Sequence, residues 1–406
     1  MHRVFTIMAA AVLAAPSPAV ADDEAPADAA PAAAKAPEGA TATEAEDDSA
    51  AKLTWGGTVE AVWGYSLNAP SNEVINGRYY DVRHNVLGLQ GAMLTNAWEA
   101  GDASGSLQLQ FGALAELFWG PDRSVEQDLL WRLLQEATTK WTTPLQALSI
   151  EGGVYNTPFG PEYNLAYQNW NWSTSNLFAL MPYQLAGMRA NYAVGKGWGV
   201  RLGVYNGWDK IVTDNNGSKS VMASLEFDDP DDEENYFYVN YMVGNERGRT
   251  DPRGAHARHT LDVYGQWHAT DRLFLRGHVL TGVENSDNDQ YDGWFGAAAY
   301  LKYLVKDWLS VAVRGDGVRG FAGSQGDNWL YSSYLSDPTH STTVMSGTAT
   351  LAIQTGKNAT VRLEARHDRA DFDYYFGGVV PRDAGGAAVA TEKNQTTVSL
   401  GLATWF

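Results

Sequence analysis

The chain has 406 residues, of which 44% are hydrophobic, 12% are aromatic and 41 are glycine. This content argues against a disordered chain, and the length admits about two or three soluble domains or one large closed β-structure. The absence of cysteine excludes disulfides, thiolate metal sites and a cysteine nucleophile. A net charge of −19 disfavours nucleic acid as a partner, because phosphate binding needs clustered Lys and Arg.

Residues 1–21 have the features of a cleaved signal peptide for Sec export. Arg3 supplies a positive charge, residues 4–15 form an apolar run, and residues 19–21 have the small-x-small pattern that signal peptidase cuts. The apolar run is too short to span a bilayer. A buried N-terminal helix is the alternative interpretation.

Residues 22–51 differ from the rest of the chain in composition. They contain nine acidic residues against one lysine, Lys35, and no aromatic residue. With so little to bury, the segment is expected to be a disordered, acidic, Ala/Pro-rich periplasmic tether. Much of the net acidity of the chain therefore belongs to this tether rather than to the part that follows.

From residue 52 to 406 apolar and polar residues alternate over segments of about ten residues, which turn residues separate. No apolar run approaches the ~20 residues that a transmembrane helix needs. The segment 360–368 is the most ionic example. Val361, Leu363, Ala365 and His367 fall on one face of it, and Arg362, Glu364, Arg366 and Asp368 on the other.

Sixteen segments show this alternation and are expected strands: 55–67, 85–97, 106–118, 133–142, 147–156, 186–195, 197–208, 220–228, 236–245, 259–269, 273–283, 294–305, 308–319, 343–355, 360–368 and 395–406. Tight turns such as Gly195-Lys196-Gly197 follow the even-numbered segments, and long connections follow the odd-numbered ones. Long-short alternation with an even strand count is typical of outer-membrane barrels. Residues 52–406 are therefore predicted to be all-β, a transmembrane antiparallel up-and-down β-barrel of about 16 strands.

The sheet is expected to close on itself, because an open edge would leave backbone N–H and C=O groups without partners in the hydrocarbon of the bilayer. A barrel of this size is too wide for side chains to fill, so water is expected inside. Charged residues that face the lumen then need no partner. An Arg that faces lipid at mid-membrane would destabilise the barrel by about 2 to 4 kcal/mol. The expected pore-wall charges are Arg189, Arg201, Arg276, Arg314, Arg362, Glu364 and Arg366.

Tryptophans lie near the ends of several expected strands. In a membrane barrel such residues form girdles at the two interfaces, although ordinary core tryptophans are the alternative. The expected girdle residues are Trp55, Trp63, Trp141, Trp208, Trp267 and Trp308.

The last expected strand ends on a terminal aromatic residue. Ser399, Gly401 and Phe406 resemble the C-terminal signal that outer-membrane proteins present to the barrel-assembly machinery, although Thr404 departs from its usual apolar choice. This machinery is therefore an expected partner.

Four segments in the middle of the chain carry a family resemblance. They are GVYNTPFGPE (Gly153 to Glu162), NWNWSTSNLF (Asn169 to Phe178), MPYQLAGMRANY (Met181 to Tyr192) and GVYNGWD (Gly203 to Asp209). In order and spacing they resemble the OmpL-like β-barrel porin family of Gram-negative bacteria. The resemblance implies an outer-membrane location, contact with lipid and lipopolysaccharide, and passive diffusion of small hydrophilic solutes. Resemblance to porins also leads us to expect a homotrimer.

The connection from Pro158 to Gln184 is the third outer loop, which general porins fold inward to narrow the channel. Its amides, hydroxyls and carboxylate could replace part of a solute's hydration. The constriction candidates are Glu162, Tyr167, Asn169, Asn171 and Ser173. The alternative is that residues 169–175 cap a short helix while Trp170 and Trp172 plug it against the wall.

Enzymatic chemistry finds little support in the sequence. The eight histidines form no HExxH motif, no phosphate-loop or EF-hand spacing occurs, and no catalytic, metal or cofactor-binding residue is nominated. A porin is the leading hypothesis. A non-conducting structural or adhesive barrel with a plugged lumen is the alternative, followed by a secreted all-β hydrolase.

Overall fold

The computed structural model describes residues 51–406 except 118–128, 252–253, 286–290 and 322–340. The expected signal peptide (1–21) and almost all of the expected tether (22–51) lie outside the described residues. None of the helices within the described ranges is long and apolar enough to cross a bilayer.

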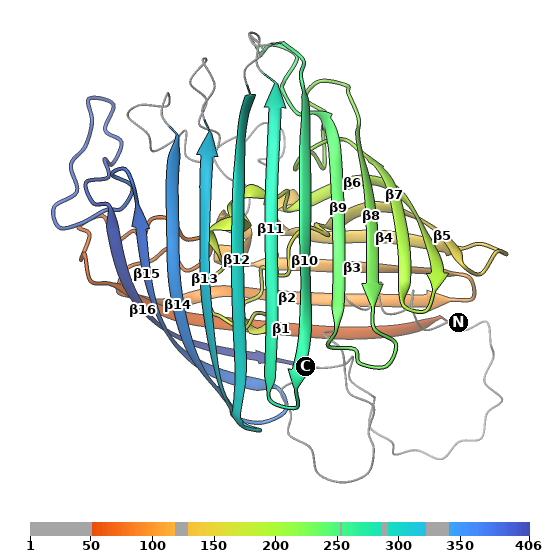
Figure 1. Cartoon of the computed structure of the whole chain (residues 1–406), viewed down its shortest axis with the longest axis horizontal. Coiled ribbons are helices and arrows are strands. Elements are labelled where there is room, and N and C mark those ends of the chain that lie inside the picture. The colour runs from red at the N-terminus through yellow and green to blue at the C-terminus, as the bar shows by residue number, and fades with distance from the viewer. Residues whose placement is uncertain (1–50, 118–128, 252–253, 286–290, 322–340) are drawn as a thin grey trace.

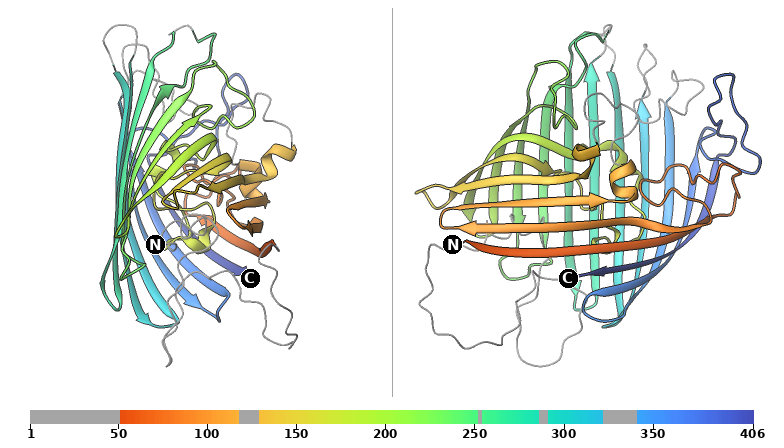
Figure 2. Two further views of the ribbon diagram at one scale, coloured as in Figure 1. Left: turned by 90° about the vertical axis from the view of Figure 1, so that its right-hand side faces the viewer. Right: turned by 180° about the vertical axis from the view of Figure 1, so that it is seen from behind.

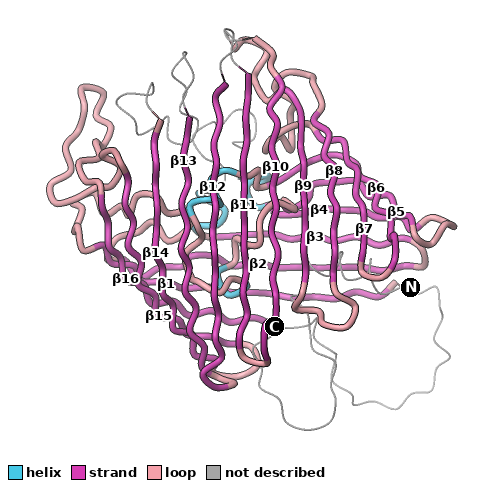
Figure 3. The backbone as a smooth tube through the Cα atoms, in the orientation of Figure 1, coloured by secondary structure: helices cyan, strands magenta, loops and turns pink. Residues whose placement is uncertain are grey.

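The described chain forms sixteen antiparallel strands in one closed barrel, as predicted, with β16 hydrogen-bonded to β1 (Figure 1; Figure 3). The strands are β1 (Lys52–Ser66), β2 (Val86–Ala100), β3 (Ala103–Phe111), β4 (Leu134–Thr142), β5 (Leu148–Asn156), β6 (Gln184–Gly195), β7 (Trp198–Tyr205), β8 (Ser220–Asp228), β9 (Tyr236–Asn245), β10 (Ala257–Thr270), β11 (Leu273–Asn285), β12 (Tyr291–Lys306), β13 (Leu309–Phe321), β14 (Thr342–Gln354), β15 (Ala359–Ala370) and β16 (Asn394–Trp405).

The wall of the barrel is uneven. The strands β3, β4 and β5 have nine residues each, whereas β12 has 16. The first strands form the wall opposite β10 to β13, and the segment between β5 and β6 runs in the space between the two walls (Figure 1; Figure 2).

Apolar side chains face outward and polar ones inward, the reverse of a soluble core. In β15, Leu363 is 49% exposed and Glu364 is 1% exposed. Such an inside-out pattern suits strands that have lipid on one side. Trp55, Trp141, Trp267 and Trp308 are also exposed, as expected for an interfacial girdle. Trp208, by contrast, lies inside the barrel, where its ring packs edge-on against Trp294.

The third strand is shorter than the predicted segment 106–118, of which Phe118 lies outside the described residues. The strand ends at Phe111 because Gly112 turns the chain with a φ of 80°. The helix α2 (Ala113–Leu117) follows and buries Leu114 against Gly91, and α3 (Leu129–Leu133) precedes β4. Side chains that alternate along a strand could not by themselves indicate this turn.

The seam between β1 and β16 is testable because the chain has no native cysteine. Ala61 lies directly opposite Leu402, and Val361 lies one strand further along the same row. Oxidation of the A61C/L402C variant should form a disulfide, since directly paired residues have Cα atoms about 4.5 to 5.5 Å apart. The cross-linked chain should migrate differently from its reduced form in boiled SDS samples.

The matched control is A61C/V361C, whose cysteines are two strand spacings, about 10 Å, apart. Equal cross-linking of both variants would contradict the closed order of the strands.

Candidate functional site

Residues 157–183, which we call loop L3, join β5 to β6 with little regular structure. Only η2 (Ala166–Gln168) and η3 (Asn176–Leu180) are helical, and both are short 3-10 helices. Most backbone N–H and C=O groups of L3 therefore have no partner within a helix or sheet. Buried groups of this kind must find partners elsewhere.

Carboxylates on the inner face of the barrel accept many of these N–H groups. Each donor is a backbone amide of L3, and each acceptor comes from a different strand, so the loop is fixed at points around the wall. Glu60 accepts from Ala166 (3.0 Å) and Tyr167 (2.7 Å), Glu364 from Trp172 (2.6 Å) and Ser173 (3.1 Å), Asp316 from Asn176 (3.0 Å), and Asp262 from Gly160 (3.2 Å).

Arginines on the same wall donate to the carbonyl groups of L3. Arg362 donates to Ala166, Tyr167 and Asn169, Arg314 to Ser173 and Thr174, Arg366 to Thr174, and Arg276 to Pro161. The sequence indicated that charges on the inner face would need no partner in a water-filled lumen. These four arginines do need partners, because L3 covers their part of the wall and a buried unpaired charge would be costly.

Acidic residues complete the pairing of the buried arginines. Arg314 contacts both Glu162 (3.1 Å) and Asp316 (2.9 Å), and Arg366 contacts Asp368 (2.6 Å). The guanidinium groups of Arg314 and Arg366 thus bond both to the loop backbone and to a carboxylate, which uses the several donors that arginine presents in one plane.

The remaining predicted wall charges lie on the opposite side of the barrel. Arg189 of β6 pairs with Glu151 of β5 and lies 4.0 Å from the ring centre of Tyr155. Arg201 of β7 contacts Glu226 of β8 at 2.9 Å. These pairs form a second charged cluster, on strands β5 to β8.

The five constriction candidates occupy different environments. Glu162, Asn169, Asn171 and Ser173 are buried, whereas Tyr167 is only partly buried and stacks on Trp405 with ring centres 4.6 Å apart. The buried four hold the loop together or hold it to the wall. Glu162 accepts from the Ser175 amide, Asn169 bonds to the backbone of Tyr163, Asn171 donates to Thr350, and the Ser173 carbonyl accepts from Arg314. Their role at a constriction stays a prediction.

The alternative combined a capped helix with tryptophans packed on the wall, and only the second part agrees with the structure for Trp172. Ser175 precedes η3, but its side chain makes no capping bond. Trp172, however, is 2% exposed and lies against the inner wall, where its indole nitrogen donates to Gln90 at 2.8 Å.

Gly401, one of the residues of the expected assembly signal, provides the surface on which Trp172 packs. A Cβ atom added to Gly401 would lie 2.3 Å from the Trp172 ring. Ser399 is also buried on the inner face, whereas Phe406 is 67% exposed and pairs with Gly57 through its backbone. The glycine therefore has a packing role in the finished barrel, and the signal role of all three residues stays a prediction.

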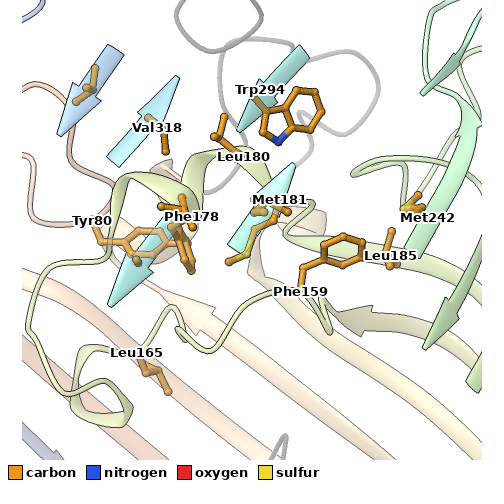
Figure 4. Close-up of a cluster of buried hydrophobic side chains, with 14 of the residues drawn as sticks. Tyr80, Phe159, Leu165, Phe178, Leu180, Met181, Leu185, Met242, Trp294 and Val318 are labelled. Carbon is orange, nitrogen blue, oxygen red and sulfur yellow. The ribbon is translucent and has the colours of Figure 1, made fainter. Parts of the chain in front are cut away.

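Apolar residues of L3 fill part of the interior (Figure 4). Leu177, Phe178, Leu180 and Met181 form a buried cluster with side chains from several strands and from the loops next to β1 and β16. Its members outside L3 include Tyr80, Leu185, Met222, Met242, Leu280, Trp294, Val318, Val344 and Tyr375. The cluster thus joins L3 to both sides of the barrel.

The end of L3 is held by Asp209, in the connection after β7. One oxygen of its carboxyl accepts from the amides of Tyr183 (2.6 Å) and Gln184 (3.1 Å). Burial raises the pKa of Asp209 from its ordinary 3.8 to about 7, although these two hydrogen bonds oppose the shift. Asp209 ends the segment Gly203 to Asp209, which carries part of the family resemblance, but the sequence did not indicate this anchoring role.

Within the described ranges no three His, Asp or Glu side chains gather in a way that could hold a metal ion. The described interior instead presents side chains that hold a loop and line a wall.

Comparisons with known proteins agree with this architecture. A family model described as "Putative beta-barrel porin-2, OmpL-like" matches residues 52–406. No curated protein sequence matches the chain.

Solved structures with the same fold include three outer-membrane proteins. The outer membrane channel DcaP of Acinetobacter baumannii has a TM-score of 0.57 at 12% identity, over 88% of this chain and 97% of that chain. The anion-selective porin from Comamonas acidovorans scores 0.55 at 11% identity, over 88% and 100%. OmpT of Vibrio cholerae scores 0.55 at 8% identity, over 88% and 98%. At such low identities the likeness shows the fold alone.

Substitution of Gly401 by alanine should loosen L3, because the new methyl group occupies the place of the Trp172 ring. Overpacking of this kind costs about 1 to 3 kcal/mol. Chymotrypsin should therefore cut the aromatic residues of L3 faster in folded G401A than in the native barrel. The control is G347A, since a methyl group there would meet nothing within 4 Å. Equal cleavage rates in both variants would contradict the role of the Trp172 contact.

Substitution of Asp209 by asparagine should remove a pH dependence of stability. A pKa raised to about 7 in the folded state favours folding below about pH 4, and this stabilisation is lost as the pH rises through 7. The melting temperature of D209N should therefore rise relative to that of the native protein between pH 5 and pH 8. Asn can still accept both amides, because both bind one oxygen.

D214N is the control for this effect. Burial raises the pKa of Asp214, but hydrogen bonds from Lys219, Asn216 and Gly217 outweigh it and leave the pKa lowered. The melting temperature of D214N should therefore not rise relative to that of the native protein over the same pH range. A D209N stability curve parallel to the native one would refute the assignment.

Proposed function

Because this chain belongs to the OmpL-like family of β-barrel porins, we propose that it lets small hydrophilic solutes and ions diffuse passively across the outer membrane of a Gram-negative bacterium. The observation that carries the proposal is the anchoring of L3 to the inner faces of β1, β13 and β15. A loop held along one side narrows the barrel without being free to swing. No catalytic step is part of the proposal.

The passage runs between L3 and the wall from β4 to β8. The inner face of this wall carries Lys140, Glu151, Arg189, Arg201 and Glu226, which pair across neighbouring strands. Arg201 and Glu226 are buried against each other, whereas Lys140 and Arg189 are partly exposed. The exposed parts of these charges can exchange hydrogen bonds with polar solutes and ions as they pass. Export by the N-terminal signal, insertion by the barrel-assembly machinery and contact with lipopolysaccharide complete the proposal.

Assembly as a homotrimer is also proposed. One solved structure of the Vibrio cholerae OmpT is described as a trimer form, at 10% identity to this chain. The trimer is a property of that protein, and the proposal for this chain rests on the fold that the two share.

A plugged, non-conducting barrel is the second candidate, and one observation favours it. The apolar cluster of L3 contacts residues on both sides of the interior, from Met222 and Met242 to Val318 and Val344. If this cluster closes the whole cross-section, the barrel has a structural or adhesive role.

Ion conductance in planar lipid bilayers separates these two candidates. The purified native barrel should conduct, and E364A should conduct more per channel, because Glu364 holds the Trp172 and Ser173 amides of L3. The matched control L363A changes the adjacent residue, which faces outward, and should leave the conductance as it is. A correctly folded native barrel that does not conduct would support the plug, and an E364A conductance equal to that of L363A would contradict narrowing by L3.

A further inference from the structure

Three tyrosines gather on the inner face at the short-turn end of β9 and β10. Tyr238 pairs directly with Tyr264, and Tyr236 begins β9 beside them. The ring centres lie 5.4 Å apart for Tyr236 and Tyr238, 5.2 Å for Tyr238 and Tyr264, and 6.2 Å for Tyr236 and Tyr264. All three side chains are partly buried, so the group keeps some aromatic surface towards the lumen.

Loop L3 adds a fourth ring to this group. Tyr163 is 42% exposed and lies two residues after Pro161, whose carbonyl accepts from Arg276. The same Arg276 donates to Gln266, which also accepts from the Tyr236 hydroxyl, so this part of L3 lies beside the tyrosines. The Asn169 side chain fixes the backbone of Tyr163, donating to its carbonyl at 2.7 Å and accepting from its amide at 2.8 Å. The Tyr163 ring is thus held in place by its backbone and is exposed inside the barrel, although no anchoring contact of L3 depends on it.

Hydrogen-bonding groups surround the four rings. Asp228 accepts from the Tyr238 hydroxyl, and Gln266 donates to the Glu234 carboxylate at 2.7 Å. Both carboxylates are partly exposed, so they retain acceptor capacity for another donor. Aromatic faces beside free acceptors form a surface that is both apolar and polar within the width of a small molecule.

The geometry argues against two other ligand classes. An aromatic cage for a cation needs rings on several sides of the ligand, but these rings contact one another and leave only their outer faces. Anions are disfavoured by Asp228 and Glu234, while the nearby Arg276 is occupied by Gln266 (2.7 Å) and the Pro161 carbonyl (3.2 Å). A neutral ligand with apolar C–H faces and peripheral hydroxyl groups fits both parts of the surface.

We propose that Tyr163, Tyr236, Tyr238 and Tyr264 form a binding surface for neutral sugars, on which a pyranose ring stacks while Asp228 and Glu234 accept from its hydroxyl groups. This inference rests on the proposed porin function and names a solute class for it. Asp228 is the last residue of β8, so a sugar held here borders the proposed passage along β4 to β8 and partly obstructs the ion path.

Sugar block of the ion current tests the proposal. The native barrel in a planar bilayer with potassium chloride is titrated with maltotriose, and the conductance should fall to a plateau as the site saturates. In Y163A and in Y236A the half-saturating concentration should rise at least tenfold, because each removes a stacking face. Y163F keeps the ring and should retain the native value.

The matched control is F237A, which removes an aromatic ring from the outer face next to Tyr236. It should leave both the salt conductance and the sugar titration unchanged. If the native barrel conducts salt but maltotriose lowers the current only in proportion to its concentration, or equally in native and Y236A barrels, the sugar surface is refuted while the porin function stands. Absence of salt conductance in the native barrel would instead overturn the porin function, and this inference with it.

Discussion

The interior of this barrel depends on one constraint, which is that the backbone of L3 must find hydrogen-bond partners although it forms almost no regular structure. Side chains of the wall supply them. Glu60 and Glu364 accept amides, and Arg362 and Arg314 donate to carbonyls. Charged side chains, which would be expected to contact water in the lumen, therefore supply the hydrogen bonds that a neighbouring strand would otherwise give to the backbone of L3. A separate pair on β7 and β8 joins Arg201 to Glu226.

Most of the barrel could be predicted from the sequence, because lipid and lumen impose opposite requirements on successive residues of a strand. The alternation in residues 360–368 indicated both the strand β15 and the direction of Glu364. Prediction was wrong where alternation carries no information. The turn at Gly112 ends β3 early, and Trp208 lies inside the barrel although it stands close to a strand end.

The candidate site was predictable only in composition. An amide-rich loop such as L3 can present its polar groups to a solute or to the wall, and residue types do not distinguish these directions. Asn171 donates to Thr350, and Trp172 lies over Gly401, so the partners are separated by about as many residues as half the chain. Such pairs exist only once the barrel has closed. Asp209 was missed for a different reason: its partners Tyr183 and Gln184 are only 26 and 25 residues away, but the alternation of side chains does not show which loop residue reaches a backbone amide.

The positions of the anchors also dictate an order of events during folding. L3 follows β5, but its partners Glu364, Arg366 and Gly401 belong to β15 and β16, 192 residues further along the chain in the case of the Trp172–Glu364 and Thr174–Arg366 bonds. The loop cannot dock when its own hairpin forms, and it must wait until the C-terminal strands have taken their places beside β1. Docking of L3 is thus a late step that requires a closed barrel. The contact between Trp172 and Gly401 can form only in a molecule whose last strand is in place.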